Sequence, residues 1–298
     1  MRTVPAFANC HSHVFHRALR GRITGADSFW TWRDQMYAIA AVLDPDLLFD
    51  LARATYAEMY LAGIRSVGEF HYVHHQPDGR PYDDPNAMGE SLIAAAREAG
   101  VRIALLDTCY LSSGFGQAPE GVQVRFSDGD VEAWAARVEE LAQKHAGEDD
   151  VVVGAAIHSV RAVPRERLAT VAGAFPHAPL HVHVSEQRAE NRDCVAATGL
   201  TPVALLAEAG AWTPRTTAVH ATHLTPDDVA TLGDARAYVC FCPTTEAELA
   251  DGIGPSAALR EAGARLTLGS DSNTVIDMFA EARAVEMHQR LASGTRGA

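Results

Sequence analysis

The sequence lacks both the long apolar run of a membrane protein and the basic excess of a nucleic-acid-binding protein. No uninterrupted apolar stretch reaches the length of about 18 residues that would indicate a transmembrane helix. The formal net charge is −13, whereas nucleic acid and anionic membranes bind basic surfaces. No basic segment followed by an apolar core opens the chain, so no signal peptide is expected. We therefore expect a cytoplasmic protein without nucleic-acid or membrane partners, with a homodimer as one option for its state in solution.

Cysteine is also scarce, and lysine is missing from one informative segment. The five cysteines are odd in number and scattered along the chain, which favours reduced thiols. Cys240 and Cys242 share a strand face and could hold a metal ion, but without a second cysteine pair we favour buried thiols. Residues 151–161 contain no lysine that could be carbamylated to bridge two ions. A single metal ion is therefore the better prediction.

What the sequence does contain is a regular alternation of strand-like and helical segments. The expected strands are 4–11, 64–71, 101–109, 151–158, 179–184, 216–220, 236–242 and 265–270, and the expected helices are 45–61, 86–99, 131–145, 165–174, 202–209, 226–232 and 256–262. Glycines 63, 100 and 263 follow helices and precede strands, as C-terminal caps do. Eight alternating units predict an α/β fold, a (β/α)8 barrel that forms a single domain over 1–298.

Two segments are longer than plain connections. Residues 21–44 follow the first expected strand and residues 71–85 follow the second, and both are rich in aromatic and polar groups. Long loops after barrel strands usually carry substrate recognition. We interpret both segments as recognition loops.

Imidazole and carboxylate groups recur where the expected strands end. His11 and His13 are two positions apart, so both project from one strand face, while His183 and Asp271 end later strands. Strand ends meet at one face of a barrel, and three histidines with a carboxylate suit zinc. His181 lies on the same strand face as His183 and is the main competitor as a ligand, although its earlier position places it deeper in the barrel.

Three further groups stand at strand ends in positions suited to catalysis. Glu186 lies just beyond His183, where it could move protons between a metal-bound water and a leaving nitrogen, although a solvated loop carboxylate is the simpler alternative. His220 ends its apolar run and is preferred over His223 for facing the barrel mouth. His158 ends the strand-like run that begins at residue 151.

With these motifs in hand, the chain resembles the amidohydrolase superfamily, and within it the formimidoylglutamate deiminase family. Histidine-x-histidine and Ser270-Asp271-Ser272 are shared across the superfamily, whereas 30–33 (Trp-Thr-Trp-Arg) and 69–72 (Glu-Phe-His-Tyr) are more specific. The matching stretches are 9–18, 28–33, 69–75, 158–163, 181–187, 219–223, 242–247 and 269–272.

The resemblance implies a role for each candidate residue. His11, His13, His183 and Asp271 would hold one Zn²⁺ per chain, with Glu186, His220 and Asp271 serving the attacking water. Substrate contacts are implied for His16, Arg33, Tyr72, His158 and Arg161. His16 departs from the family, which commonly has glutamine there. The family's small flanking β-rich domain has no counterpart in this sequence, so we expect a fragment or a shortened gene product.

The reaction implied by the resemblance is zinc-dependent hydrolysis of the dicarboxylate N-formimino-L-glutamate to N-formyl-L-glutamate and ammonia, a step of histidine degradation. Arginine binds carboxylates through two parallel hydrogen bonds, and Arg33 and Arg161 are the expected donors. One alternative is an aminohydrolase acting on a cyclic amidine such as guanine or an adenosine derivative. Another is an inactive, metal-stabilised barrel.

Overall fold

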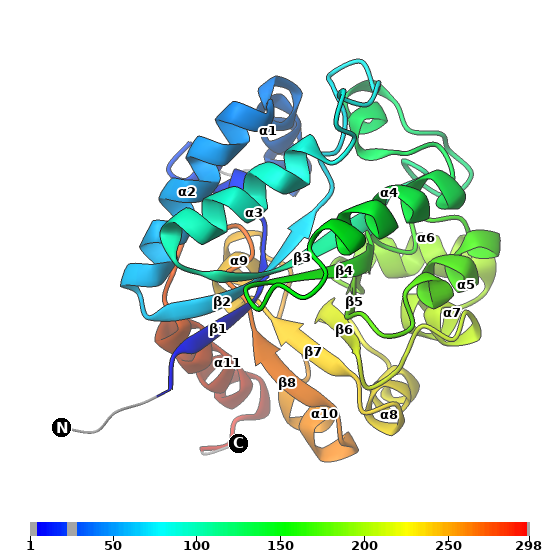
Figure 1. Cartoon of the computed structure of the whole chain (residues 1–298). Coiled ribbons are helices and arrows are strands. Elements are labelled where there is room, and N and C mark those ends of the chain that lie inside the picture. Colours follow the sequence, from blue (N-terminus) through cyan, green and yellow to red (C-terminus); the bar gives the residue numbers. More distant parts are fainter. Residues whose placement is uncertain (1–4, 23–28, 297–298) are drawn as a thin grey trace.

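The computed structural model of the chain describes residues 5–22 and 29–296, and its strands form one parallel sheet in the order β1 to β8 (Figure 1). The strands are β1 (Phe7–Ser12), β2 (Ile64–His71), β3 (Arg102–Cys109), β4 (Val151–Ile157), β5 (Leu180–Val184), β6 (Thr216–His220), β7 (Tyr238–Phe241) and β8 (Arg265–Leu268). A parallel bridge between Ser12 and Asp271 joins the end of β1 to the segment after β8. The predicted (β/α)8 barrel is therefore confirmed, and all eight strands lie where the sequence places them.

Helices surround this sheet (Figure 1). They are α1 (Phe29–Val42), α2 (Pro45–Leu61), α3 (Ala87–Ala99), α4 (Val131–Lys144), α5 (Arg165–Ala174), α6 (Arg188–Thr198), α7 (Pro202–Glu208), α8 (Pro226–Asp234), α9 (Pro243–Glu248), α10 (Ser256–Ala262) and α11 (Met278–Ser293), with short 3-10 helices η1 (Val14–Leu19) and η2 (Gly121–Phe126). Among the described residues, none of these helices is long and apolar enough to cross a bilayer.

The helix ends show the local chemistry that sets the element boundaries. The side chain of Asp44 accepts a hydrogen bond at the start of α2, and Thr225 does the same for α8, which has proline at its first position. Gly100 and Gly263 end α3 and α10 in the left-handed conformation, with φ of 76° and 104°. The glycine signals in the sequence therefore marked these ends correctly.

The prediction that 21–44 is a loop is wrong for residues 29–42, which form α1, whereas a recognition role for this segment stays a prediction. Residues 23–28, including Ser28 of the motif, lie outside the described part of the chain. The helix packs Met36 and Ala40, one turn apart, into the core with exposed fractions of 6% and 0%. In the sequence, the neighbouring aromatic residues obscure this helical spacing, so the segment resembles a loop. The segment 71–85 contains neither helix nor strand beyond His71, as expected.

The candidate site residues lie where strands end and loops begin, and several residues there have strained backbone conformations. Ser185, His220 and Asp271 have positive φ values of 53°, 68° and 47°, which residues other than glycine adopt rarely. Gly269 has no room for a side chain, because a Cβ atom there would lie 2.7 Å from both Cβ and the carbonyl oxygen of His11. The end of β8 thereby approaches β1 closely and brings Asp271 beside the histidine pair.

Candidate active site

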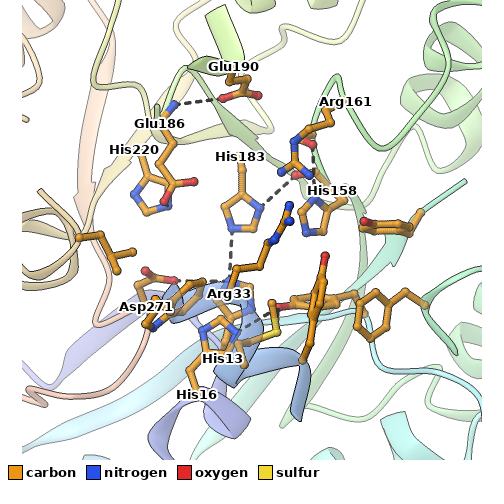
Figure 2. A pocket seen from close by; sticks show the side chains of 18 residues that line it. His13, His16, Arg33, His158, Arg161, His183, Glu186, Glu190, His220 and Asp271 are labelled. Carbon is orange, nitrogen blue, oxygen red and sulfur yellow. Dashed lines mark hydrogen bonds and ion pairs between the residues drawn. The ribbon is translucent and has the colours of Figure 1, made fainter. Parts of the chain in front are cut away.

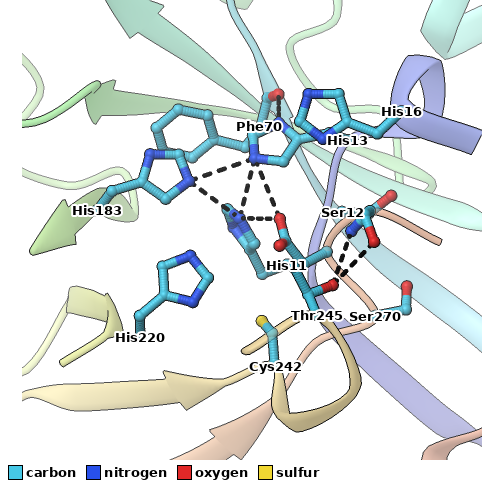
Figure 3. Close-up of polar contacts among 12 residues, drawn as sticks. His11, Ser12, His13, His16, Phe70, His183, His220, Cys242, Thr245 and Ser270 are labelled. Carbon is cyan, nitrogen blue, oxygen red and sulfur yellow. Dashed lines mark hydrogen bonds and ion pairs between the residues drawn. The ribbon is translucent and has the colours of Figure 1, made fainter. Parts of the chain in front are cut away.

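Three imidazole nitrogens and one carboxylate oxygen converge at the mouth of the barrel (Figure 3). The Nε2 atom of His11 lies 3.1 Å from that of His13, and the Nε2 atom of His183 lies 3.2 Å from both. Asp271 Oδ1 is 3.3 Å from His11 Nε2 and 3.4 Å from His13 Nε2. The structure thus brings together all four residues that the sequence proposed as metal ligands.

Hydrogen bonds among these nitrogens do not explain the cluster. His13 Nδ1 lies 2.9 Å from the carbonyl oxygen of Phe70, and His183 Nδ1 lies 3.0 Å from that of His158. Each Nδ1 must donate to its carbonyl, so in the neutral rings both Nε2 atoms carry lone pairs. Burial holds the pKa of both histidines well below the usual value and keeps them neutral. Two lone pairs that face each other at 3.2 Å repel one another and suit a cation placed between them.

The donor set fits a divalent metal ion of the zinc type. Tetrahedral zinc with Zn–N bonds of about 2.0–2.1 Å has ligand atoms about 3.3 Å apart, which matches the separations of 3.1 to 3.4 Å in the cluster. Burial raises the pKa of Asp271, but the hydrogen bond with His11 and the electrostatic effect of the neighbouring histidines outweigh burial and lower it, so the carboxylate is ionised. An anionic oxygen with neutral imidazole nitrogens suits zinc and similar ions.

A polar network fixes the loop that carries Asp271. The amide nitrogen of Asn273 donates to the carbonyl oxygens of His13 and Asp271, each at 3.1 Å, and to Ser12 Oγ at 3.0 Å. The backbone N–H of Asp271 in turn donates to the carbonyl oxygen of His11 at 3.0 Å. The two ends of the sheet are therefore joined by hydrogen bonds at the point where the ligand atoms meet.

His220 lies between two carboxylates beside this cluster. Its Nδ1 is 3.3 Å from Glu246 Oε1, and its Nε2 is 3.8 Å from Glu186 Oε1. Burial would lower the pKa of His220, but the charges of Glu186, Glu246 and Asp271 raise it well above its usual value. Burial raises the pKa of Glu186. A carboxyl group with a raised pKa beside an imidazole with a raised pKa is suited to proton transfer.

The five residues proposed to bind substrate all line the cavity into which this cluster opens (Figure 2). His16 Nε2 lies 3.0 Å from the hydroxyl of Tyr72, and the His16 ring packs edge-on against Trp32 at 5.1 Å between ring centres. Arg33 reaches the cavity from α1, while His158 and Arg161 follow β4. The guanidinium of Arg161 makes no hydrogen bond or ion pair with any residue in the described ranges, 5–22 and 29–296. Histidine and arginine side chains from distant segments of the chain thus line one cavity.

The structure also separates the competing histidines. His181 lines a cavity at the opposite end of the barrel, together with Cys10 and Thr217, so only His183 contributes to the ligand cluster. His223 does not line the catalytic-type cavity, and its backbone N–H donates to the carbonyl oxygen of Ser185 at 2.9 Å. Both choices made from strand positions therefore agree with the geometry.

A comparison with known protein families identifies the family to which this chain belongs. A family model described as "Amidohydrolase family" matches residues 3–297. The chain belongs to the amidohydrolase family. The resemblance inferred from the sequence motifs is thereby confirmed.

Relatives of this amidohydrolase include several deaminases. The chain is 40% identical over 297 residues to the formimidoylglutamate deiminase of Pseudomonas aeruginosa, with 97% of the chain and 64% of the relative covered. It is 28% identical over 306 residues to the 5-methylthioadenosine/S-adenosylhomocysteine deaminase of Teredinibacter turnerae, covering 99% of the chain and 62% of the relative. A crystal structure of an amidohydrolase from Brucella melitensis superposes with a TM-score of 0.93 at 39% identity, covering 98% of the chain and 66% of that structure. The chain therefore spans less than two thirds of the length of these relatives.

Sequence reasoning missed two carboxylates of the amidohydrolase site. Glu246 on α9 contacts His220 and accepts a hydrogen bond from the backbone N–H of Cys242 at 2.8 Å. Glu190 on α6 lines the cavity and contacts the main chain of Glu186. Glu190 and Glu246 lie on the short helices α6 and α9, for which the sequence showed no clear signal.

Proposed function

We propose that this amidohydrolase catalyses the zinc-dependent hydrolytic deimination of N-formimino-L-glutamate, yielding N-formyl-L-glutamate and ammonia. The proposal rests on one observation: the cluster of candidate metal ligands opens into the same cavity that Arg33 and Arg161 line. The substrate has two carboxylates, and their burial is costly unless cationic donors replace the lost water. The 40% identity to the P. aeruginosa formimidoylglutamate deiminase supports the same substrate.

His11, His13, His183 and Asp271 would hold one zinc ion per chain. When bound, zinc supplies a water molecule whose pKa is lowered toward neutrality. The carbonyl groups that accept from Nδ1 of His13 and of His183 would leave the Nε2 atoms of both rings free to bind the ion.

Glu186 would supply the proton transfers, and His220 would stabilise the developing charge. As the water oxygen forms a bond to the formimino carbon, Glu186 would pass one O–H proton to the terminal nitrogen; the second O–H proton follows by the same route, the C–N bond breaks, and ammonia leaves. Asp271 is the second candidate acceptor for that proton. Protonated His220, held by Glu246, donates a hydrogen bond to the oxygen as negative charge develops on it. The raised pKa values of Glu186 and His220 support these two roles.

Substrate orientation would come from the other residues that line the cavity. Arg161 and Arg33 each form paired hydrogen bonds with one carboxylate of the substrate. Tyr72 and His16 present a hydroxyl and an imidazole, and His158 lies beside Arg161. This arrangement would hold the formimino carbon near the metal cluster and exclude monocarboxylate analogues.

The rival function is deamination of a purine derivative, which the 28% identity to a methylthioadenosine/S-adenosylhomocysteine deaminase favours. An uncharged purine offers no carboxylate to the two arginines of the cavity. Ammonia release from formiminoglutamate, guanine and 5-methylthioadenosine separates the two functions. An inactive, metal-stabilised barrel would release ammonia from none of them.

Arg161→Lys tests the dicarboxylate assignment. Lysine keeps the charge but loses the planar pair of donors, so KM should rise at least about tenfold while zinc content stays unchanged. Formiminoglycine, which lacks the side-chain carboxylate, should be a poor substrate for the unaltered protein. Normal substrate binding by both Arg161→Lys and Arg33→Lys, or equal hydrolysis of formiminoglycine, would refute the assignment.

A further inference from the structure

Glu190 occupies a position that the proposed mechanism does not use. It is the third residue of α6, and its Oε2 accepts a hydrogen bond from the backbone N–H of Glu186 at 3.2 Å (Figure 2). The other carboxyl oxygen, Oε1, is buried and has no hydrogen-bond partner within the ranges 5–22 and 29–296. Glu190 also lines the substrate cavity. A buried acceptor without a partner is unfavourable, which suggests that a bound molecule supplies the missing donor.

The neighbours of Glu190 limit what that donor can be. Glu190 lines a side cavity together with Glu186, the proposed proton-transfer group, and Arg161, the proposed carboxylate-binding group. Burial, opposed by the positive charge of Arg161, raises the pKa of Glu190 to about 7. A cationic donor placed against this carboxyl would favour its ionised form.

We propose that Glu190 binds the substrate by accepting a hydrogen bond from the N–H group that joins the formimino carbon to Cα of glutamate. This inference rests on the proposed function. In formiminoglutamate, this N–H lies between the carbon that is attacked and the α-carboxylate. Glu186, Glu190 and Arg161 line the same side cavity, and Glu190 is seen between the other two in the view of Figure 2. The amidine nitrogens are the only hydrogen-bond donors of this substrate, so the substrate can reach Oε1 only through one of them.

A purely structural role for Glu190 makes different predictions. A glutamate at the third helical position commonly caps a helix by accepting from a preceding backbone N–H, as Oε2 does here. Loss of such a cap lowers stability or disturbs Glu186, which would change turnover for all substrates alike. Recognition of the inner N–H instead changes the preference between substrates that have this N–H and substrates that lack it.

The test compares formiminoglutamate with its analogue methylated on the inner nitrogen, using Glu190→Gln. The amide oxygen of glutamine can still accept from Glu186, while its NH2 group faces the cavity and cannot accept from the substrate. The unaltered protein should prefer formiminoglutamate by at least about tenfold in kcat/KM, because a site built to bond an N–H rejects the analogue without it. In Glu190→Gln, this preference should fall below about threefold. A steric penalty of the methyl group would persist, because glutamine has the same shape as glutamate.

Controls keep folding and charge effects apart from recognition. Asp193→Asn removes a carboxylate from α6 that lines the same side cavity with 62% of its side chain exposed, and it should retain the full preference. Glu190→Ala, checked for zinc content and thermal unfolding, should lose the preference as well. If the protein hydrolyses formiminoglutamate but Glu190→Gln keeps the preference, the role of Glu190 is refuted while the proposed function stands. Absence of formiminoglutamate turnover in the unaltered protein refutes both.

Discussion

Replacement of the buried Arg125 by methionine should destabilise the protein and loosen α1, the helix that carries Arg33. The side chain of Arg125 is fully buried, and its guanidinium donates to three backbone carbonyl oxygens: those of His75 at 3.0 Å, of Leu43 at 2.7 Å and of Ala40. Ala40 and Leu43 lie at the C-terminal end of α1, where carbonyl groups lack helical partners. Arg125 thus anchors this end of α1 to the segment that follows β2.

The size of the effect follows from the three carbonyl groups that methionine leaves unsatisfied. At about 1 kcal/mol each, at the lower end of the range for buried acceptors, the free energy of unfolding should fall by about 3 kcal/mol. In urea titrations this appears as a lower midpoint with an unchanged slope, and KM for formiminoglutamate should rise because Arg33 is less well positioned. As a control, Arg53→Met removes an exposed arginine paired with Asp50 and Glu98 and should change stability by less than about 0.5 kcal/mol. If Arg125→Met is as stable as the Arg53→Met control, the anchoring role is refuted.

Three further changes test the site and its surroundings. His183→Ala should abolish or strongly weaken zinc binding, whereas His181→Ala should retain zinc because it lines the opposite cavity; zinc loss only in His181→Ala, measured by atomic absorption, would reverse the ligand assignment. Glu186→Gln should keep zinc but lower kcat by about 10² or more, and near-normal turnover would transfer the proton-transfer role to Asp271. Burial raises the pKa of Asp128, but hydrogen bonds from Arg137 and His75 outweigh burial and lower this pKa. The ionised carboxylate therefore stabilises the fold above the pKa of the unfolded state, and this stabilisation is lost as the pH falls below about 4. Asp128→Asn should therefore be less stable than the unaltered protein at pH 7, with a difference that shrinks in acid; an equal difference at both pH values would contradict this reasoning.

Much of the barrel could be predicted because the strands are short apolar runs, several of which end in a polar group. This pattern alone places His183, His220 and Asp271 at strand ends, and the fold brings the three side chains together. Two of the helices that the sequence pattern missed escape it for a physical reason. The helix α6 is strongly polar, with only Cys194 buried, and α9 spans only six residues, so neither shows a clear apolar periodicity.

The two carboxylates were missed for the same reason. Glu190 and Glu246 lie on α6 and α9, and their contacts with Glu186 and His220 depend on how these short helices meet the barrel mouth. Such contacts between separate segments are set by packing, which a single sequence does not encode as a local pattern. The strand pattern therefore predicted the ligand cluster, while the groups that position its catalytic neighbours required the structure.

The most direct test of the proposed function is ammonia release from formiminoglutamate by the purified 298-residue chain, with metal content determined on the same sample. The account predicts about one zinc ion per chain, turnover that is lost on chelation and restored by zinc, and little or no ammonia from guanine or 5-methylthioadenosine. Zinc-loaded protein that releases no ammonia from formiminoglutamate, or that prefers a purine derivative, would contradict it.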